Sequence, residues 1–238
     1  GDVPLITEPY ESLENLYLPR DPSASVYSQI EKDLKEAIAD LPDAAFVNNG
    51  FRITKATAQT LLANVYMQMS GFPLKANHYA DAAAAAKSII TAGKHSLTEH
   101  IDHDQNSAYN ILRTKDILTE YVFTRERSAS ITDYQNRWVQ LSFPVNAAAW
   151  GTFKYTLTNN AIRPMPTLIN AYNPVTDLRI KERQFFFTEY EDDKGEMSQF
   201  EAPSPWFYVD EEAMFETGIS GKDFPIYRYA EVLLIAAE

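Results

Sequence analysis

The stretch that decides the fold is Thr54–Gly93, which reads "TKATAQTLLANVYMQMSGFPLKANHYADAAAAAKSIITAG". Its first half predicts a helix that begins after an N-cap at Thr54 and stops at Gly71. Its second half predicts a helix from near Asn77 to Gly93. Because a short turn joins them, we expect an antiparallel hairpin whose small residues permit close approach. The apolar residues at helical spacing are Ala58, Leu61, Leu62, Val65, Tyr66 and Met69, followed by Tyr79, Ala82, Ala83, Ala86 and Ile90.

A third helix is predicted upstream, from about Ser23 to Leu41, and Pro42 closes it. Its apolar residues form one stripe of about 120°, which is typical of a helix with a single buried face. The hairpin itself approximates the tetratricopeptide order of Leu, aromatic, Gly, aromatic and Ala, although an insertion at Phe72 departs from that repeat. Such a unit is stable only when other helices cover it. The residues in that order are Leu62, Tyr66, Gly71, Tyr79 and Ala83.

Proline usage divides the rest of the chain. Only Pro42 and Pro73 lie between Ser23 and Gln140, so the remaining eleven of the thirteen prolines lie outside the helical block. We therefore predict an extended surface segment at 1–22, a helical block at 23–93, a loop-rich region at 94–226 and a further helix at 227–238. The runs of strand type are 121–125, 138–143, 153–158 and 183–190, with a short helix at 166–172 and a loop or edge strand at 203–208.

Composition excludes several classes of protein. The formal net charge of −12 argues against a nucleic-acid partner, because such a partner requires a basic surface. The chain has no cysteine, which excludes disulfides and thiolate chemistry. No phosphate-binding loop, nucleophile elbow or zinc-protease motif is present, so we expect neither a cofactor nor a catalytic residue. No run of eighteen apolar residues predicts a membrane span.

Several blocks of the sequence resemble the SusD/RagB family of outer-membrane nutrient-binding lipoproteins. These blocks are "GDVPLITEP" at the start, "FRITKATAQTLLANVYMQMSG" from Phe51, "YADAAAAAKSIITAGKHSL" from Tyr79, "PTLINAYNPVTDLR" from Pro166 and "YRYAEVLLIAAE" from Tyr227. They occur in the family's order over the whole chain. The matching residues are Arg52, Thr54, Lys55, Leu62, Ala63, Tyr66, Tyr79, Ala82, Gly93, Asp177 and Arg179.

The resemblance implies a mainly helical, tetratricopeptide-like scaffold that carries loop-rich insertions and small β-hairpins. It also implies a function without catalysis: capture of a glycan at the cell surface and its delivery to a SusC-like TonB-dependent transporter. A full member has an N-terminal signal, a lipidated cysteine that anchors it to the outer membrane, earlier repeat helices and a further C-terminal portion. The chain is therefore expected to be a central segment, cut at both ends. A peptide-binding RagB-like member and a tetratricopeptide-like scaffold for protein partners stay open as alternatives.

Aromatic side chains in the loop-rich region are the candidate ligand residues. An aromatic face packs against the C–H side of a sugar ring, and such sites are mostly preformed surface hollows. Trp150 is the first candidate, because small residues and Gly151 surround it in "NAAAWGTFKY"; Trp138, Tyr155 and Trp206 follow. The alternative is that each tryptophan anchors a loop to the scaffold. The family's motifs mark its scaffold and do not identify ligand residues.

Two further features of the sequence have structural explanations. The run "HSLTEHIDHD" brings His95, His100 and His103 close in sequence, but its spacing fits no zinc motif and is typical of a solvated loop. The final stretch "YRYAEVLLIAAE" predicts the first helix of another repeat. We expect the face formed by Ala230, Leu233, Leu234 and Ala237 to pack on the helical block, away from solvent.

Overall fold

The computed structural model describes residues 1–9, 12, 17–130, 162–191, 194–217 and 219–238. The chain forms two compact units. The first unit contains residues 1–97, 119–124 and 225–238, and the second contains residues 98–118 and 125–224. The first unit is therefore assembled from three separate parts of the sequence. Within the described parts of the chain, no helix has the length and apolar character needed to cross a membrane.

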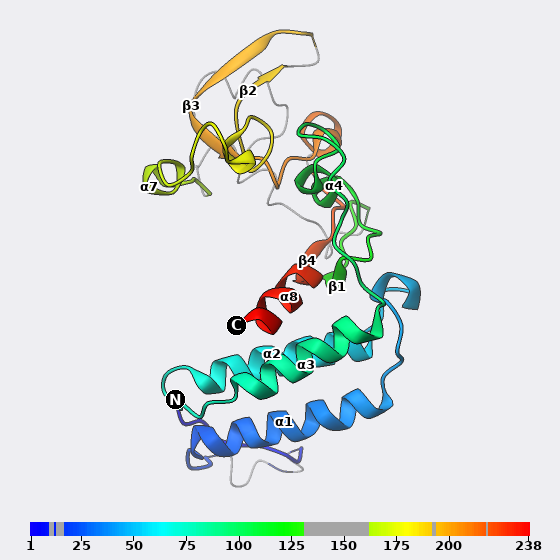
Figure 1. The fold of residues 1–238 in the computed structure, drawn as a ribbon, viewed down its shortest axis with the longest axis vertical. Helices are drawn as coiled ribbons and strands as arrows, with labels where there is room; N and C mark the ends of the chain where they lie inside the picture. The colour runs from blue at the N-terminus through cyan, green and yellow to red at the C-terminus, as the bar shows by residue number, and fades with distance from the viewer. Residues whose placement is uncertain (10–11, 13–16, 131–161, 192–193, 218) are drawn as a thin grey trace. The chain divides into compact units, whose positions relative to one another are not determined.

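The first unit is built on three helices that lie side by side (Figure 1): α1 (Ser23–Asp40), α2 (Lys55–Ser70) and α3 (Tyr79–Ala92). All three were predicted from the sequence. The N-terminus of α2 is held by its N-cap residue, because the backbone N–H of Thr54 donates to Oγ1 of Thr57. The end of α3 is set by Gly93, whose φ of 63° is a left-handed conformation that glycine adopts without strain. The expected helical hairpin is thus confirmed.

The core of the first unit lies around α2, which packs against α1 on one side and α3 on the other. Helix α1 contributes only half-buried side chains to this core. It is also joined to α2 by a polar contact, in which the Tyr66 hydroxyl donates to Glu31 Oε1 at 2.8 Å. The buried core residues of these helices are Ala56, Leu62, Ala63, Val65, Tyr66, Met69, Ala82, Ala86 and Ile89.

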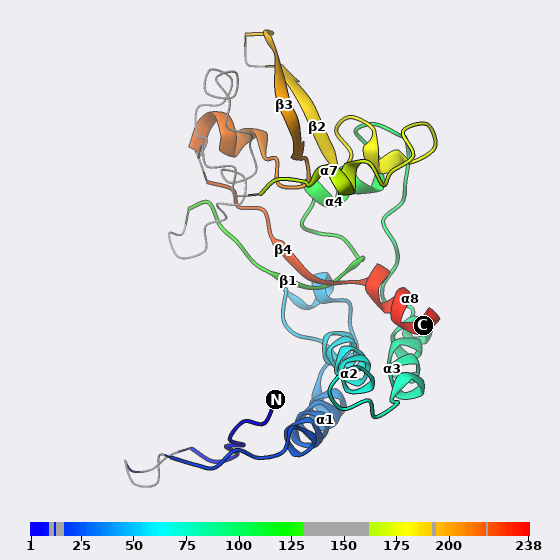
Figure 2. The same ribbon diagram turned by 90° about the vertical axis from the view of Figure 1, so that its left-hand side faces the viewer.

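Helix α8 (Tyr229–Ala237) packs on α3, as Figure 2 shows, but not through the face predicted from the sequence. Val232 and Ile235 are buried in the core, whereas Leu234 is 71% exposed and Leu233 is half-buried. The expectation that Ala230, Leu233, Leu234 and Ala237 form the packed face was therefore wrong.

The reason is that nearly every residue of α8 is apolar, so its sequence pattern favours no single face. The strand β4 (Phe224–Arg228) leads directly into α8 and pairs with β1 (Tyr121–Arg125) in a two-stranded sheet. The backbone N–H of Tyr229 then donates to the carbonyl of Glu120 at 2.8 Å. This contact orients the first residue of α8, and a second contact, from the Asn64 amide to Glu231 Oε1 at 2.8 Å, helps to fix the rotation of the helix.

The second unit contains short elements and ordered loops. Its described elements include α4 (Ala108–Thr114), α7 (Pro166–Ile169) and an antiparallel hairpin of β2 (Phe186–Glu191) and β3 (Met197–Pro205). The strand expected at 183–190 begins only at Phe186, because Arg183 has a positive φ of 59°. The expected strands at 138–143 and 153–158 lie outside the described residues.

A separate aromatic core holds the second unit together. Phe187 of β2 is fully buried and makes edge-to-face contacts with Phe200 and Trp206, both at 5.1 Å between ring centroids. Phe215 packs against this cluster from the π-helical turn Ala213–Thr217. Aromatic rings thus connect the β-hairpin to the segment that follows it, and this segment forms one side of the cleft described next.

Candidate functional site

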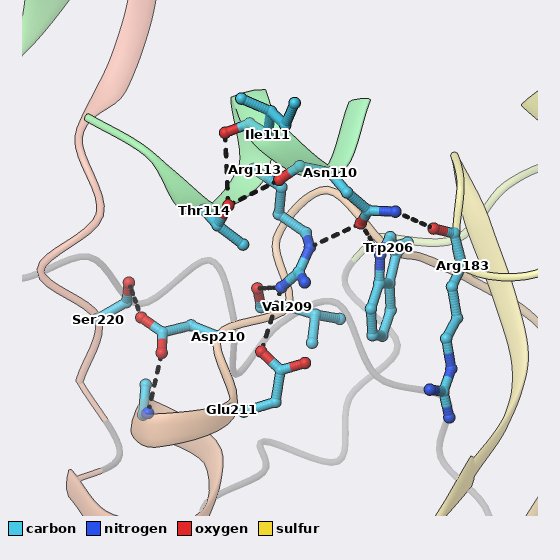
Figure 3. A network of polar contacts seen from close by, with 11 residues as sticks. Asn110, Ile111, Arg113, Thr114, Arg183, Trp206, Val209, Asp210, Glu211 and Ser220 are labelled. Atoms are coloured by element: carbon cyan, nitrogen blue, oxygen red, sulfur yellow. Dashed lines mark hydrogen bonds and ion pairs between the residues drawn. The ribbon is translucent and has the colours of Figure 1, made fainter. Parts of the chain in front are cut away.

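Asn110 on α4 is the centre of a buried hydrogen-bond network in the second unit (Figure 3). Its Oδ1 accepts from the indole Nε1–H of Trp206 at 2.6 Å and from Nε–H of Arg113 at 3.2 Å. Its Nδ2 group donates to the backbone carbonyls of Asp104 and Arg183, at 2.9 and 3.0 Å. One planar amide therefore connects α4 and the nearby loop at Asp104 to two segments that are distant in the sequence, at Arg183 and Trp206.

Arg113 lies one turn further along α4, and its side chain is only 9% exposed. The guanidinium stacks on the Trp206 ring, 4.4 Å from the centroid. Its Nη1 donates to the carbonyl of Val209 at 2.7 Å and forms an ion pair with Glu211 at 3.2 Å. A buried guanidinium requires such partners, because an unpaired charge in this position is costly. Arg113 thereby attaches the backbone at Val209 to α4.

Asp210 positions the other side of the same region. Its Oδ1 accepts from the backbone N–H of Ala213 at 3.1 Å and so caps the helical turn that begins there. Its Oδ2 accepts from the Ser220 hydroxyl at 2.6 Å. Because both carboxylate oxygens are engaged, the 209–213 segment and the chain at Ser220 are held in a defined arrangement.

These elements enclose an open cleft of about 300 Å³. It is lined by the end of α4, which includes Arg113, and by the segments around Glu211 and Gly221. A smaller hollow of about 20 Å³ adjoins it, shares Val209, Asp210 and Lys222 with it and adds the aromatic rings of Phe207, Tyr208 and Phe224. The residues that line the larger cleft are Arg113, Thr114, Asp116, Val209, Asp210, Glu211, Glu212, Gly221 and Lys222.

The cleft is acidic. Asp116, Asp210, Glu211 and Glu212 line it, against the two cations Arg113 and Lys222. Lys222 forms an ion pair with Asp116 and donates to the carbonyl of Lys115 at 2.9 Å. Both cations are thus already engaged by groups of the protein itself. The arrangement offers carboxylate and hydroxyl oxygens to a ligand, and we therefore regard it as a polar binding hollow.

Burial shifts the pKa of two groups close to this region. Desolvation raises the pKa of the Asp223 carboxyl, although the backbone N–H of Arg127 donates to it at 2.8 Å and partly opposes the shift. Burial in the aromatic core raises the pKa of the Tyr190 hydroxyl to about 12, so this group stays protonated at neutral pH. Tyr190 is therefore a neutral core residue.

The structure describes one of the four ligand residues expected from the sequence. Trp206 is 4% exposed, with Arg113 over its ring and Phe187 against it. This placement fits the alternative considered for each tryptophan, that of a residue anchoring a loop. Trp138, Trp150 and Tyr155 lie outside the described residues.

The histidines of the 95–104 run lie in different environments. His95 is buried, and its Nδ1–H donates to the carbonyl of Thr119 at 2.8 Å. His100 and His103 are exposed, and their rings are hydrogen-bonded to each other at 2.9 Å. Asp102 accepts from the backbone N–H groups of Asp104 and Asn106, an arrangement typical of a loop. In the described part of the chain, no three His, Asp or Glu side chains are grouped as a metal site requires.

Sequence reasoning missed Asn110 and Arg113. Both lie in "SAYNILRT", a seven-residue helix with its N-cap that showed no motif. The signal that the sequence did contain is weak: Asn110 and Arg113 are three positions apart, so they lie on the same face of a short helix. Their partners are about 75 to 100 residues away in the sequence, so spacing could not indicate them.

With the fold and the cleft defined, the chain can be placed among known proteins. The class that the fold defines is a tetratricopeptide-like helical scaffold with a loop-rich insertion. The chain matches a SusD superfamily protein from Parabacteroides distasonis with a TM-score of 0.83 and 25% identity, over 100% of this chain and 50% of that one. The resemblance to SusD-like proteins is therefore confirmed, and the chain has their fold.

Two proteins named for glycan binding share this fold. Surface glycan-binding protein A from Bacteroides uniformis matches with a TM-score of 0.66 and 18% identity, over 100% of this chain and 49% of that one. Surface glycan-binding protein A from Bacteroides thetaiotaomicron, in complex with laminarihexaose, matches with a TM-score of 0.61 and 16% identity, over 92% of this chain and 50% of that one. The chain thus spans about half the length of each of these proteins. No family model and no curated protein matches the sequence.

Proposed function

We propose that this chain is part of a cell-surface protein that binds an oligosaccharide and delivers it, without catalysis, to a SusC-like TonB-dependent transporter. The observation that carries the proposal is the agreement of the whole chain with SusD-like folds, two of which are named for surface glycan binding. The open polar cleft beside an aromatic hollow is consistent with it, because sugars are bound by hydroxyl partners together with aromatic faces.

The proposal includes an outer-membrane location on the cell surface, through a lipid anchor on a part of the protein that precedes this segment. It includes no cofactor, no metal and no nucleic-acid partner. The net charge of −12 supports the last point, since a phosphate backbone would be repelled.

The proposed ligand residues are Trp150 first, then Trp138 and Tyr155, on the sequence argument alone. Trp206 is proposed to act through its neighbours, because its buried ring and its bond to Asn110 support the wall of the cleft. The alternative functions are peptide capture, as in RagB-like proteins, and a scaffold for protein partners.

The decisive experiment is calorimetry of the purified full-length protein against a panel of oligosaccharides and peptides. We expect an oligosaccharide to bind, and we expect Trp150→Ala to weaken that binding at least tenfold, which corresponds to about 1.4 kcal/mol. Thr167→Ala, a substitution at an exposed residue of α7, is the control and should leave the affinity unchanged. The glycan function fails if only peptides bind, and all ligand functions fail if the protein co-purifies solely with a soluble protein partner.

A further inference from the structure

The polar cleft of the second unit is lined by more carboxylates than cations. Its two cations are engaged: Arg113 with Asn110, Val209 and Glu211, and Lys222 with Asp116 and Lys115. The Thr114 hydroxyl donates to the carbonyl of Asn110 at 2.9 Å. Each of these three side chains thus already donates to at least one group of the protein itself.

The acceptors, in contrast, retain capacity. Glu212 is exposed and forms no hydrogen bond or ion pair with any residue that the structure describes. Asp116 accepts from Lys222 and from the backbone N–H of Asp223 through Oδ1, and Glu211 contacts Arg113 through Oε2. Oδ2 of Asp116 and Oε1 of Glu211 form no hydrogen bond or ion pair with a described residue. A ligand that donates hydrogen bonds therefore suits this cleft.

Charge narrows the ligand further. Four carboxylates face two cations that are already paired, so an incoming carboxylate would add a like charge without gaining a free partner. Sugar hydroxyls donate to carboxylates without this cost. The adjoining hollow supplies an aromatic ring, Phe207, which is 37% exposed and available to the C–H face of a sugar. The cleft volume of about 300 Å³ suits one or two sugar rings rather than a long chain.

We infer that this cleft is a sugar subsite that accepts uncharged sugars and excludes acidic ones. The inference rests on the proposed glycan function and specifies its ligand class. In the subsite, Glu212 and Asp116 accept hydroxyl donors, while Asn110 and the ion-paired Arg113 hold the lining segments in place. Glu212 is the residue that most directly sets the selectivity, because its charge has no counter-ion among the described residues.

The test compares the affinities of uncharged and acidic hexasaccharides for the purified full-length protein. The uncharged probes are laminarihexaose, cellohexaose, xylohexaose and mannohexaose, and the acidic probe is hexagalacturonate. We expect at least one uncharged probe to bind at least tenfold more tightly than hexagalacturonate in low salt. Glu212 forms no hydrogen bond or ion pair with a described residue, and Glu212→Gln should reduce this ratio of affinities at least threefold. Glu216→Gln removes the same charge from the π-helical turn that follows Glu212, at a residue that does not line the cleft, and should leave the ratio unchanged.

A second measurement locates the bound sugar. Carbodiimide labelling of carboxylates should be reduced at Glu212 and Asp116 when the uncharged hexasaccharide is bound, whereas labelling of the exposed Glu201 on β3 should not change. If an uncharged sugar binds but neither the ratio nor the labelling responds, the inference is wrong and the proposed function stands. If hexagalacturonate binds with the same affinity as the uncharged probes, the proposed selectivity is wrong. If no sugar binds, both proposals fail.

Discussion

Asn110→Ala should destabilise the second unit more than any other single change from asparagine in the described chain. The substitution removes the acceptor of Trp206 Nε1–H and of Arg113 Nε–H, and the donors to the carbonyls of Asp104 and Arg183. Each buried group that loses its partner costs about 1 kcal/mol or more, so the four together predict a loss of about 4 kcal/mol. Asn110→Asp keeps the two acceptor contacts but turns a carboxylate oxygen toward the carbonyls of Asp104 and Arg183, so it should also destabilise the unit.

The assay uses the distribution of tryptophan. All three tryptophans lie between residues 125 and 224, so urea unfolding followed by tryptophan fluorescence reports the second unit. Circular dichroism at 222 nm reports mainly the helices of the first unit. In addition, the indole N–H of Trp206, assigned with Trp206→Phe, should exchange with solvent much faster in Asn110→Ala, because its acceptor is gone.

The control is Asn106→Ala, a change at an exposed residue of the same region whose side-chain amide donates to Asp102. It should cost less than about 0.5 kcal/mol. The reasoning would be refuted by an Asn110→Ala protein within about 1 kcal/mol of the parent in the fluorescence transition, with unchanged exchange of the Trp206 indole. A loss confined to the circular-dichroism transition would also contradict it, because that would place the effect in the first unit.

Two further predictions concern the first unit. Ile235→Ala should cost about 2 to 4 kcal/mol of unfolding free energy and Leu234→Ala less than about 0.5 kcal/mol, because of these two residues Ile235 is buried and Leu234 is exposed. Equal losses in thermal melts would contradict the packing of α8. Burial lowers the pKa of His95 from its usual 6.5, and its buried Nε2 has no partner among the described residues. The unfolded chain therefore takes up a proton near pH 6.5 that the folded chain refuses, so stability should be constant above this pH and fall as the pH drops below it. Urea midpoints between pH 8 and 5 should show this fall in the parent and a smaller one in His95→Gln; parallel curves would exclude His95 as the cause.

The helical part of the fold could be predicted because its signals are local. The N-cap at Thr54, the stop at Gly93 and the apolar spacing between them each depend on residues within one or two helical turns. The rotation of α8 could not be predicted, because Val232, Leu233, Leu234 and Ile235 are all apolar and compete equally for the core. Tertiary contacts decide which of them is buried, among them the bond from Tyr229 N–H to the carbonyl of Glu120 and the bond from the Asn64 amide to Glu231.

The candidate site shows the same division. By itself, the sequence determined the helical scaffold, the resemblance to SusD-like proteins, the acidic charge and the aromatic content of the loop-rich region. Tertiary structure alone decided that Trp206 lies in the core and that Asn110 and Arg113 carry the wall of a cleft. The physical reason is range: a helix is specified by neighbours three and four residues apart, whereas this cleft is specified by hydrogen bonds between residues 73 to 98 positions apart.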